Sequence, residues 1–194
     1  MNSVAMTALL TLGRKEVVRI IRIWSQTILP PAITMTLYFV IFGNLIGKRI
    51  GQMDGFDYMS FIVPGLVMMS VITNSYGNIV SSFFGAKFSK HIEEMLVSPM
   101  PNWVILFGHV LGALARGIMV GGIVTIISLF FTEIHIHNIW IVLSTVILTS
   151  IVFALAGFVN ACLATKFDDI AIIPAFVLTP LTYLGGVFYS ISLL

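Results

Sequence analysis

Few groups of residues in this 194-residue chain have the types and spacing that chemistry requires. His135 and His137 could begin a metal site, but a usable site needs three or four ligands and no further candidate lies near them. Segment 43–49 is similar to a phosphate-binding loop, but it has three intervening residues instead of four and ends in Arg. Cys162 is the single cysteine, which excludes a disulfide framework and a thiolate zinc site. These patterns predict that the chain is not an enzyme.

The polar side chains of greatest interest lie inside long apolar runs. Arg116 lies among glycines, and a guanidinium buried in a membrane needs an ion partner or water. It is therefore a candidate site residue, with structural pairing or snorkelling as the alternative. Asn74 and Asn78 are four residues apart and share one helix face. That face either forms hydrogen bonds between packed helices or lines a translocation route.

The elements that position these side chains are apolar runs long enough to cross a bilayer. Hydrophobic residues make up 58% of the chain and charged residues only 9%, whereas a soluble domain carries about 25% charged residues. A helix rises about 1.5 Å per residue, so roughly 20 apolar residues span the hydrocarbon core. No alternation typical of a membrane barrel is present. We therefore expect an all-α integral membrane protein with a single domain over residues 1–194, whose spans are 27–46, 58–84, 103–131, 139–164 and 170–190.

The basic residues indicate the orientation of these spans, because Lys and Arg favour the cytoplasmic side. A cytoplasmic N-terminus leaves only Lys48 and Arg49 outside, and it places the other span-flanking basic residues inside: Arg14, Lys15, Arg19, Arg22, Lys87, Lys90 and Lys166. Membrane lipids account for this basic charge. The net charge of +2 is too small to indicate nucleic acid as a partner.

Residues 10–24 are expected to form an amphipathic helix lying on the membrane. Its apolar face would hold Leu10, Val17, Ile20, Ile21 and Trp24, and the Arg and Lys heads on the opposite face would stay in water. A frayed cytosolic extension of the first span is the alternative.

The segment between the second and third spans has a helical pattern of its own. Apolar residues at helical spacing oppose charged ones, and two prolines close the run. The apolar residues are Phe88, Ile92, Met95 and Leu96, the charged ones Lys90, Glu93 and Glu94, and the prolines Pro99 and Pro101. We expect a short helix across the cytoplasmic face, either as a docking surface for a soluble partner or as an ordinary interfacial helix.

Small residues and carboxylates add two further expectations. Gly108 and Gly112 form one row on the third span, and Ala113, Gly117 and Gly121 form another, so helix backbones can approach closely there. Asp168 and Asp169 precede the fifth span, where the helix dipole favours negative charge; contact with a partner is the alternative.

With these features the whole chain resembles the membrane permeases of ABC type-2 exporters, as found in bacterial inner membranes. The resemblance rests on the amphipathic entry helix, on the inner segment 90–99 and on the segment 180–189, Pro-Leu-Thr-Tyr-Leu-Gly-Gly-Val-Phe-Tyr. Such permeases have six spans and a longer chain, whereas this sequence stops abruptly after apolar residues at Leu194. The resemblance therefore implies a truncated chain that lacks its last span.

The resemblance also implies a mechanism and its residues. Two permease chains pair, and each sits on a separate cytosolic ABC ATPase that binds ATP and Mg, so this chain carries no cofactor. The ATPase-coupling element would be residues 87–100, with Lys87, Lys90, His91, Glu93, Glu94, Leu96 and Pro99 as its coupling residues. Spans two and five would line the path of a hydrophobic or amphipathic substrate, with Asn74, Asn78, Arg116, Thr179 and Tyr183 on it.

Two other functions compete with this one. A secondary transporter driven by an ion gradient would use Arg116 and the Asn residues for its substrate, but it needs a membrane-embedded carboxylate. Every Asp and Glu is expected in a break between spans or near a span end, which disfavours that function. A non-transporting anchoring subunit would use the glycine rows as docking faces.

Overall fold

The computed structural model describes residues 2–53, 55–133 and 136–190, and within them the chain is a helical bundle with one small hairpin. The elements, in chain order, are α1 (Asn2–Arg22), α2 (Trp24–Thr27), α3 (Leu29–Tyr38), the π-helix η1 (Phe39–Ile46), α4 (Gly47–Ile50), β1 (Gln52–Met53), β2 (Phe56–Asp57), α5 (Tyr58–Phe88), α6 (His91–Val97), α7 (Asn102–Ser128), α8 (Ile139–Leu163), α9 (Phe167–Ile173), the π-helix η2 (Pro174–Leu178) and α10 (Thr179–Leu184). Strands β1 and β2 pair antiparallel.

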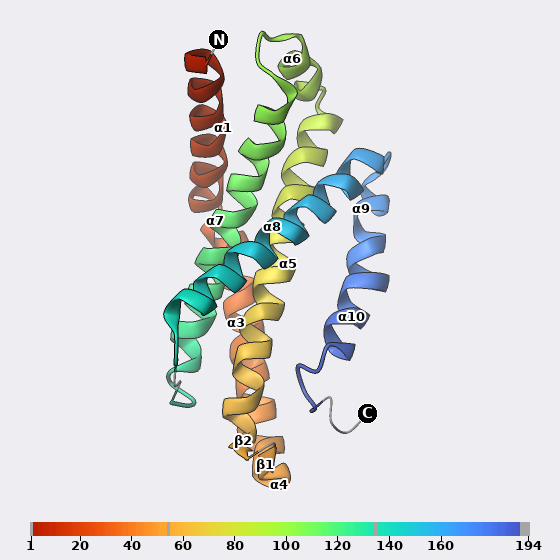
Figure 1. Ribbon diagram of the computed structural model, residues 1–194. Coiled ribbons are helices and arrows are strands. Elements are labelled where there is room, and N and C mark those ends of the chain that lie inside the picture. The colour runs from red at the N-terminus through yellow and green to blue at the C-terminus, as the bar shows by residue number, and fades with distance from the viewer. Residues whose placement is uncertain (1, 54, 134–135, 191–194) are drawn as a thin grey trace.

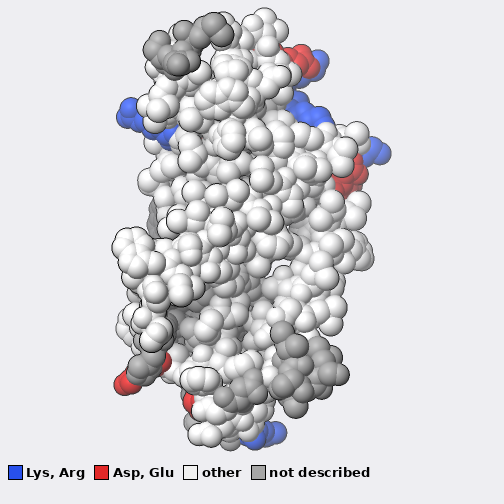
Figure 2. Space-filling model, viewed as in Figure 1, with Lys and Arg blue, Asp and Glu red and all other residues white. Residues whose placement is uncertain are grey.

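Five helical segments are long and apolar enough to cross a bilayer, which confirms the expected all-α integral membrane fold. They are Trp24–Gly43, Tyr58–Phe88, Asn102–Ser128, Ile139–Leu163 and Phe167–Leu184. The N-terminus and α6 lie at one end of the bundle, and α4 with the β1–β2 hairpin lies at the other (Figure 1). Charged side chains gather toward these two ends, and the band between them is almost uncharged on the face shown (Figure 2).

Local sequence accounts for where several helices begin and end. Asp57 Oδ2 accepts a hydrogen bond from Met59 N at 3.2 Å at the start of α5, and Asn138 Oδ1 accepts one from Trp140 N at 3.0 Å at the start of α8. The last span ends at Leu184, before residue 190, because Gly186 has a φ of 79° that a helix cannot continue through.

Helix α5 lies at the centre of the bundle, where α7 and α8 pack against it and α1 packs along α7 (Figure 1). The glycine rows of α7 permit this packing, as expected. Gly108 and Gly112 face Leu12 and Glu16 of α1, whereas Gly117 and Gly121 face α5. One helix thus presents two rows of small residues to two different neighbours.

Gly157 of α8 is the position where added volume should harm the bundle most directly. A methyl group on its Cα would lie 2.9 Å from Tyr76 O and 2.7 Å from Ile79 Cγ2, both on α5. Because the backbone oxygen cannot rotate away, Gly157→Leu must push α8 off α5. We expect a stability loss of about 3 kcal/mol, measured as reversible unfolding in detergent.

Gly122→Leu on α7 is the matched control, since a methyl group at Gly122 meets nothing within 4 Å. It should change stability by no more than about 0.5 kcal/mol. Equal losses for the two variants would contradict the close packing of α8 on α5.

Candidate functional site

Helix α6 forms an exposed surface at the end of the bundle where the chain begins. Ile92 and Met95 turn inward and pack against the cluster that contains Phe83, Phe84 and Ile105. The side chains that remain exposed are His91, Glu93, Glu94, Leu96 and Val97. We call these five residues the α6 surface. Of the residues predicted on the apolar side of this helix, Ile92 and Met95 pack inward, whereas Leu96 is 55% exposed.

The connections of α6 to its neighbours are short and constrained. Lys90 joins α5 to α6 with a φ of 61°, a left-handed conformation that non-glycine residues seldom adopt. Ser98 is extended, and Pro99 and Pro101 separate α6 from the first residue of α7. Any displacement of α6 must therefore act on the adjoining ends of α5 and α7.

Lys87 ties the end of α5 to the end of α8. Its Nζ donates hydrogen bonds to Cys162 O and to Ala164 O, each at 2.7 Å. These carbonyls belong to the last turn of α8, where a cation also interacts favourably with the helix dipole. Lys87 thus holds two spans together beside the α6 surface.

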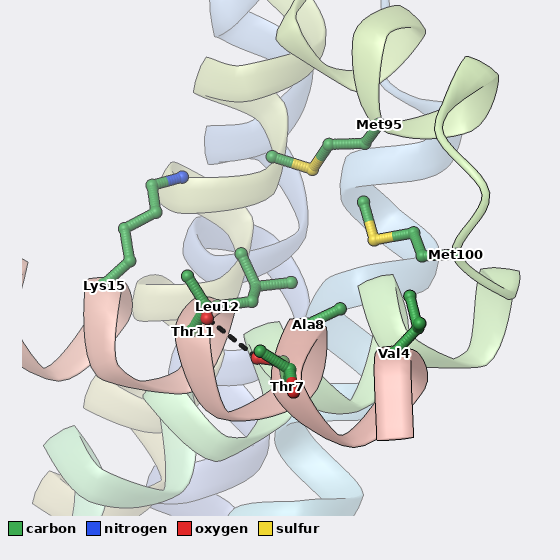
Figure 3. A pocket seen from close by; sticks show the side chains of 8 residues that line it. All are labelled: Val4, Thr7, Ala8, Thr11, Leu12, Lys15, Met95 and Met100. Atoms are coloured by element: carbon green, nitrogen blue, oxygen red, sulfur yellow. Dashed lines mark hydrogen bonds between the residues drawn. The ribbon is translucent and has the colours of Figure 1, made fainter. Parts of the chain in front are cut away.

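A hollow of about 680 Å³ separates α1 from α6 (Figure 3). In this view Met95 and Met100 lie on the side of the hollow opposite α1, and Lys15 is the one basic side chain drawn at its edge. The lining residues are Val4, Thr7, Ala8, Thr11, Leu12, Lys15, Met95 and Met100. The hollow gives the α6 end an apolar recess beside an exposed acidic helix.

The most polar part of the interior is an ion-paired group that we call the charged cluster, formed by Glu16, Arg19, Asn78 and Ser82. Glu16 is 0% exposed, and its Oε2 accepts hydrogen bonds from Arg19 Nη2 at 2.9 Å and from Ser82 Oγ at 2.8 Å. Arg19 Nη2 also donates to Asn78 Oδ1 at 2.8 Å. The cluster joins α1 to α5.

The charged cluster corrects one expectation and adds to another. Arg19 does not stay in water, because Glu16 and Asn78 hold its guanidinium. Glu16 lies outside the five spanning segments, as expected, but its side chain is buried and packs beside Gly112 of α7. The sequence did contain a signal for the burial of Glu16. Leu12, Glu16 and Ile20 are spaced four residues apart and therefore lie on one face of the helix, where the acid stands between two apolar residues that are buried.

The residues predicted to line the substrate path fall into separate groups. Asn78 belongs to the charged cluster, and Arg116 lies near enough to Arg19 for the two charges to interact. Asn74 is buried and donates to Ser70 O of its own helix at 3.0 Å.

Thr179 and Tyr183 lie on α10. Thr179 is exposed and donates to Pro174 O at 2.9 Å, and the Tyr183 hydroxyl lies 3.0 Å from that of Tyr38. No hydrogen bond in the described part of the chain joins this pair to the charged cluster. Within one chain, the predicted path residues therefore do not form a single site.

The structure adds no support for a phosphate-binding loop or a metal site among the described residues. Segment 43–49 is helical, divided between η1 and α4, and so does not form a phosphate-binding loop. Residues 2–53, 55–133 and 136–190 hold no group of three metal-binding side chains, and His135 lies outside them. Asp169 Oδ2 accepts hydrogen bonds from Thr165 N at 2.8 Å and Lys166 N at 2.9 Å, which is the expected role at the start of α9.

Comparison with known proteins shows the family of the chain and several relatives. The family described as ABC-2 type transporter matches residues 7–194. The inner membrane transport permease YadH of Escherichia coli K12 is 61% identical over 187 residues, which cover 96% of this chain and 73% of that protein. Nodulation protein J of Rhizobium leguminosarum bv. viciae is 23% identical over 157 residues, covering 80% of this chain and 61% of that protein. No solved structure matches significantly.

Proposed function

Because the chain belongs to the ABC-2 type transporter family, we propose that it is the permease subunit of an ATP-driven exporter in the bacterial inner membrane. Its cargo is a hydrophobic or amphipathic molecule such as a drug, a lipid or a lipid-linked glycan. A separate cytosolic ATPase binds ATP and Mg and supplies the energy, and this chain has no ATPase site. The family match over residues 7–194 carries the proposal.

The α6 surface supports the proposed contact with the ATPase. Glu93 and Glu94 offer negative charge, and Leu96 and Val97 offer exposed apolar area beside the hollow between α1 and α6. A mixed surface of this kind suits a soluble protein partner better than a lipid headgroup layer that is itself anionic. We therefore assign ATPase coupling to Lys90, His91, Glu93, Glu94, Leu96 and Pro99, with Lys87 anchoring the element to α8.

Rigid connections explain how the motion of an ATPase reaches the spans. Helix α6 joins α5 through Lys90 and α7 through the two prolines, so a shift of α6 pulls on both spans. The charged cluster links α5 to α1, which extends the moving unit to the N-terminal helix. Discrete rearrangements of packed helices are the usual outcome of such a pull.

A second copy of the chain completes the proposed route, which runs between the two permeases along α5 and the segment α9–α10. Thr73 and Ser81 are polar residues exposed on the spanning part of α5, and Leu178 is the one residue of Phe167–Leu184 that is buried within one chain. A homodimer would cover such surfaces. In this arrangement the α6 end and the N-terminus face the cytoplasm.

The second candidate, a transporter driven by an ion gradient, gains one observation from the structure. Glu16 is a fully buried carboxylate in the bundle, and such transporters use embedded carboxylates as ion or proton sites. However, Arg19 and Ser82 both bind its Oε2, and this ion pair within the chain makes Glu16 a poorer candidate for an exchanging ion or proton site.

Affinity purification from native membranes, followed by transport in vesicles, tests the proposal. We expect a stable complex with a separate chain that carries a P-loop ATPase, and cargo movement that requires ATP. Transport that an ion gradient drives in ATP-free vesicles would instead establish the second candidate. A chain that purifies without an ATPase and transports nothing would be an anchoring subunit.

A further inference from the structure

Arg116 carries a charge that no described carboxylate of the chain pairs with. It lies on α7 roughly 20 Å from the start of the helix, given a rise of about 1.5 Å per residue. Its Nε is buried and has no hydrogen-bond partner, and within the described residues no carboxylate forms an ion pair with it. A guanidinium at this depth is costly unless something pairs with it.

The carboxylates in the described part of the chain do not supply that partner. Glu16 already binds Arg19 and lies 3.9 Å from Lys15 Nζ, so two cations surround it before Arg116 is counted. The remaining described carboxylates lie in breaks between spans or at helix ends: Asp57, Glu93, Glu94, Glu133, Asp168 and Asp169. A second copy would bring the same carboxylates at the same depths, so a homodimer does not balance the charge either.

Asn78 provides an independent sign of a missing ligand. It is 0% exposed, its Oδ1 accepts from Arg19, and its Nδ2 has no hydrogen-bond partner. A buried amide donor without an acceptor costs free energy. Arg19 contacts Asn78, and Arg116 lies one helical turn after Gly112, on the row of α7 that packs against Glu16 of α1. This part of the bundle therefore holds donor groups that the described residues do not use, and positive charge in excess.

We propose that Arg19, Arg116 and Asn78 bind the phosphate of an anionic amphipathic molecule taken from the bilayer. Guanidinium groups bind phosphate through paired hydrogen bonds, and the anion would neutralise the excess charge. The Arg19 side chain is 28% exposed, so a headgroup would reach it first, whereas Asn78 is fully buried and would be reached only if the side chains around it move. The biological role of this site rests on the proposed export function, in which the bound phosphate would belong to the headgroup of the cargo.

Native mass spectrometry of the purified chain in detergent micelles tests the site without any ATPase. The probe is phosphatidylglycerol or zwitterionic phosphatidylcholine in the micelles, or inorganic phosphate in the buffer. We expect saturable retention of phosphatidylglycerol, weakened roughly tenfold or more in Arg116→Gln, which removes a charge-assisted contact. Arg22→Gln, which removes an exposed arginine from the last turn of the same helix as Arg19, is the matched control and should retain the lipid.

Asn78→Asp separates ligand binding from folding. It places a carboxylate beside Arg19, so the variant should lose phosphatidylglycerol while its melting temperature stays at or above that of the parent protein. Inorganic phosphate that binds with the same dependence on Arg116, in place of the lipid, would support the anion site and assign it to a water-borne ligand. Unchanged phosphatidylglycerol retention in Arg116→Gln and Asn78→Asp, or equal retention of phosphatidylcholine, would overturn the proposal. Failure to find an ATPase partner would leave this binding result unaffected.

Discussion

Replacing Glu16 by glutamine is expected to lower the stability of the chain in detergent by about 3 kcal/mol. The change preserves the shape of the side chain beside Gly112 but removes the negative charge that Arg19 binds at 2.9 Å. It leaves Arg19 and Arg116 near each other without any carboxylate between the helices. Removing one partner from a buried ion pair costs about 3–5 kcal/mol, and the partial exposure of Arg19 favours the lower end.

Equilibrium unfolding of Glu16→Gln, compared with Glu133→Gln, provides the measurement. Glu133 lies on an exposed link between spans, so its replacement should change stability by no more than about 0.5 kcal/mol. In a double-mutant cycle, Arg19→Gln should cost less in the Glu16→Gln background than in the parent. Equal stability of Glu16→Gln and Glu133→Gln would show that α1 is not joined to α5 through this ion pair.

Reversing the charge of Glu93 or Glu94 is expected to reduce transport about tenfold or more while membrane insertion stays intact. Both side chains are exposed on α6, so lysine at either position disturbs little of the core. At an interface with the ATPase the same change replaces attraction by repulsion, and loss of one well-formed charged contact corresponds to about tenfold or more in binding. Cargo transport and cargo-stimulated ATP hydrolysis in reconstituted vesicles provide the measurement.

Glu133→Lys at the opposite end of the bundle is the control for these variants, since it makes the same charge change away from α6. It should transport normally. Glu93 and Glu94 both lie in the first turn of α6, so lysine at either position weakens the helix by about 0.3–1 kcal/mol. A melting curve must therefore accompany each transport assay. Normal transport by both charge-reversed variants would remove α6 from the mechanism.

The spans could be predicted from the sequence because length and hydropathy alone decide whether a segment crosses a bilayer. Their ends were less predictable, since a span also stops where the backbone changes direction. The last span shows this, because Gly186 adopts a positive φ beyond Leu184 while the apolar character continues to residue 190. The short helix α6 was also predicted, because its pattern of charges, apolar residues and prolines is local.

The charged cluster could not be predicted in the same way, because its contacts join residues far apart in the sequence. The sequence pattern predicts a wet face for the Arg and Lys residues of α1, whereas Arg19 binds Asn78 of α5 and Glu16 binds Ser82 of α5. The glycine rows of α7 indicated close packing but not the identity of the neighbour. Only the three-dimensional arrangement shows that the row Gly108–Gly112 receives the N-terminal helix. Pairing of this kind depends on tertiary structure.

Site-specific photo-cross-linking in native membranes is the most direct test of the central claim that α6 receives the ATPase. A cross-linker at the exposed Leu96 of α6 is compared with one at the exposed Phe56 in the hairpin at the opposite end of the bundle. The account predicts an adduct from position 96 with an ATP-binding subunit and none from position 56. An adduct from position 56, or cross-linking of neither position to such a subunit in actively transporting membranes, would contradict it.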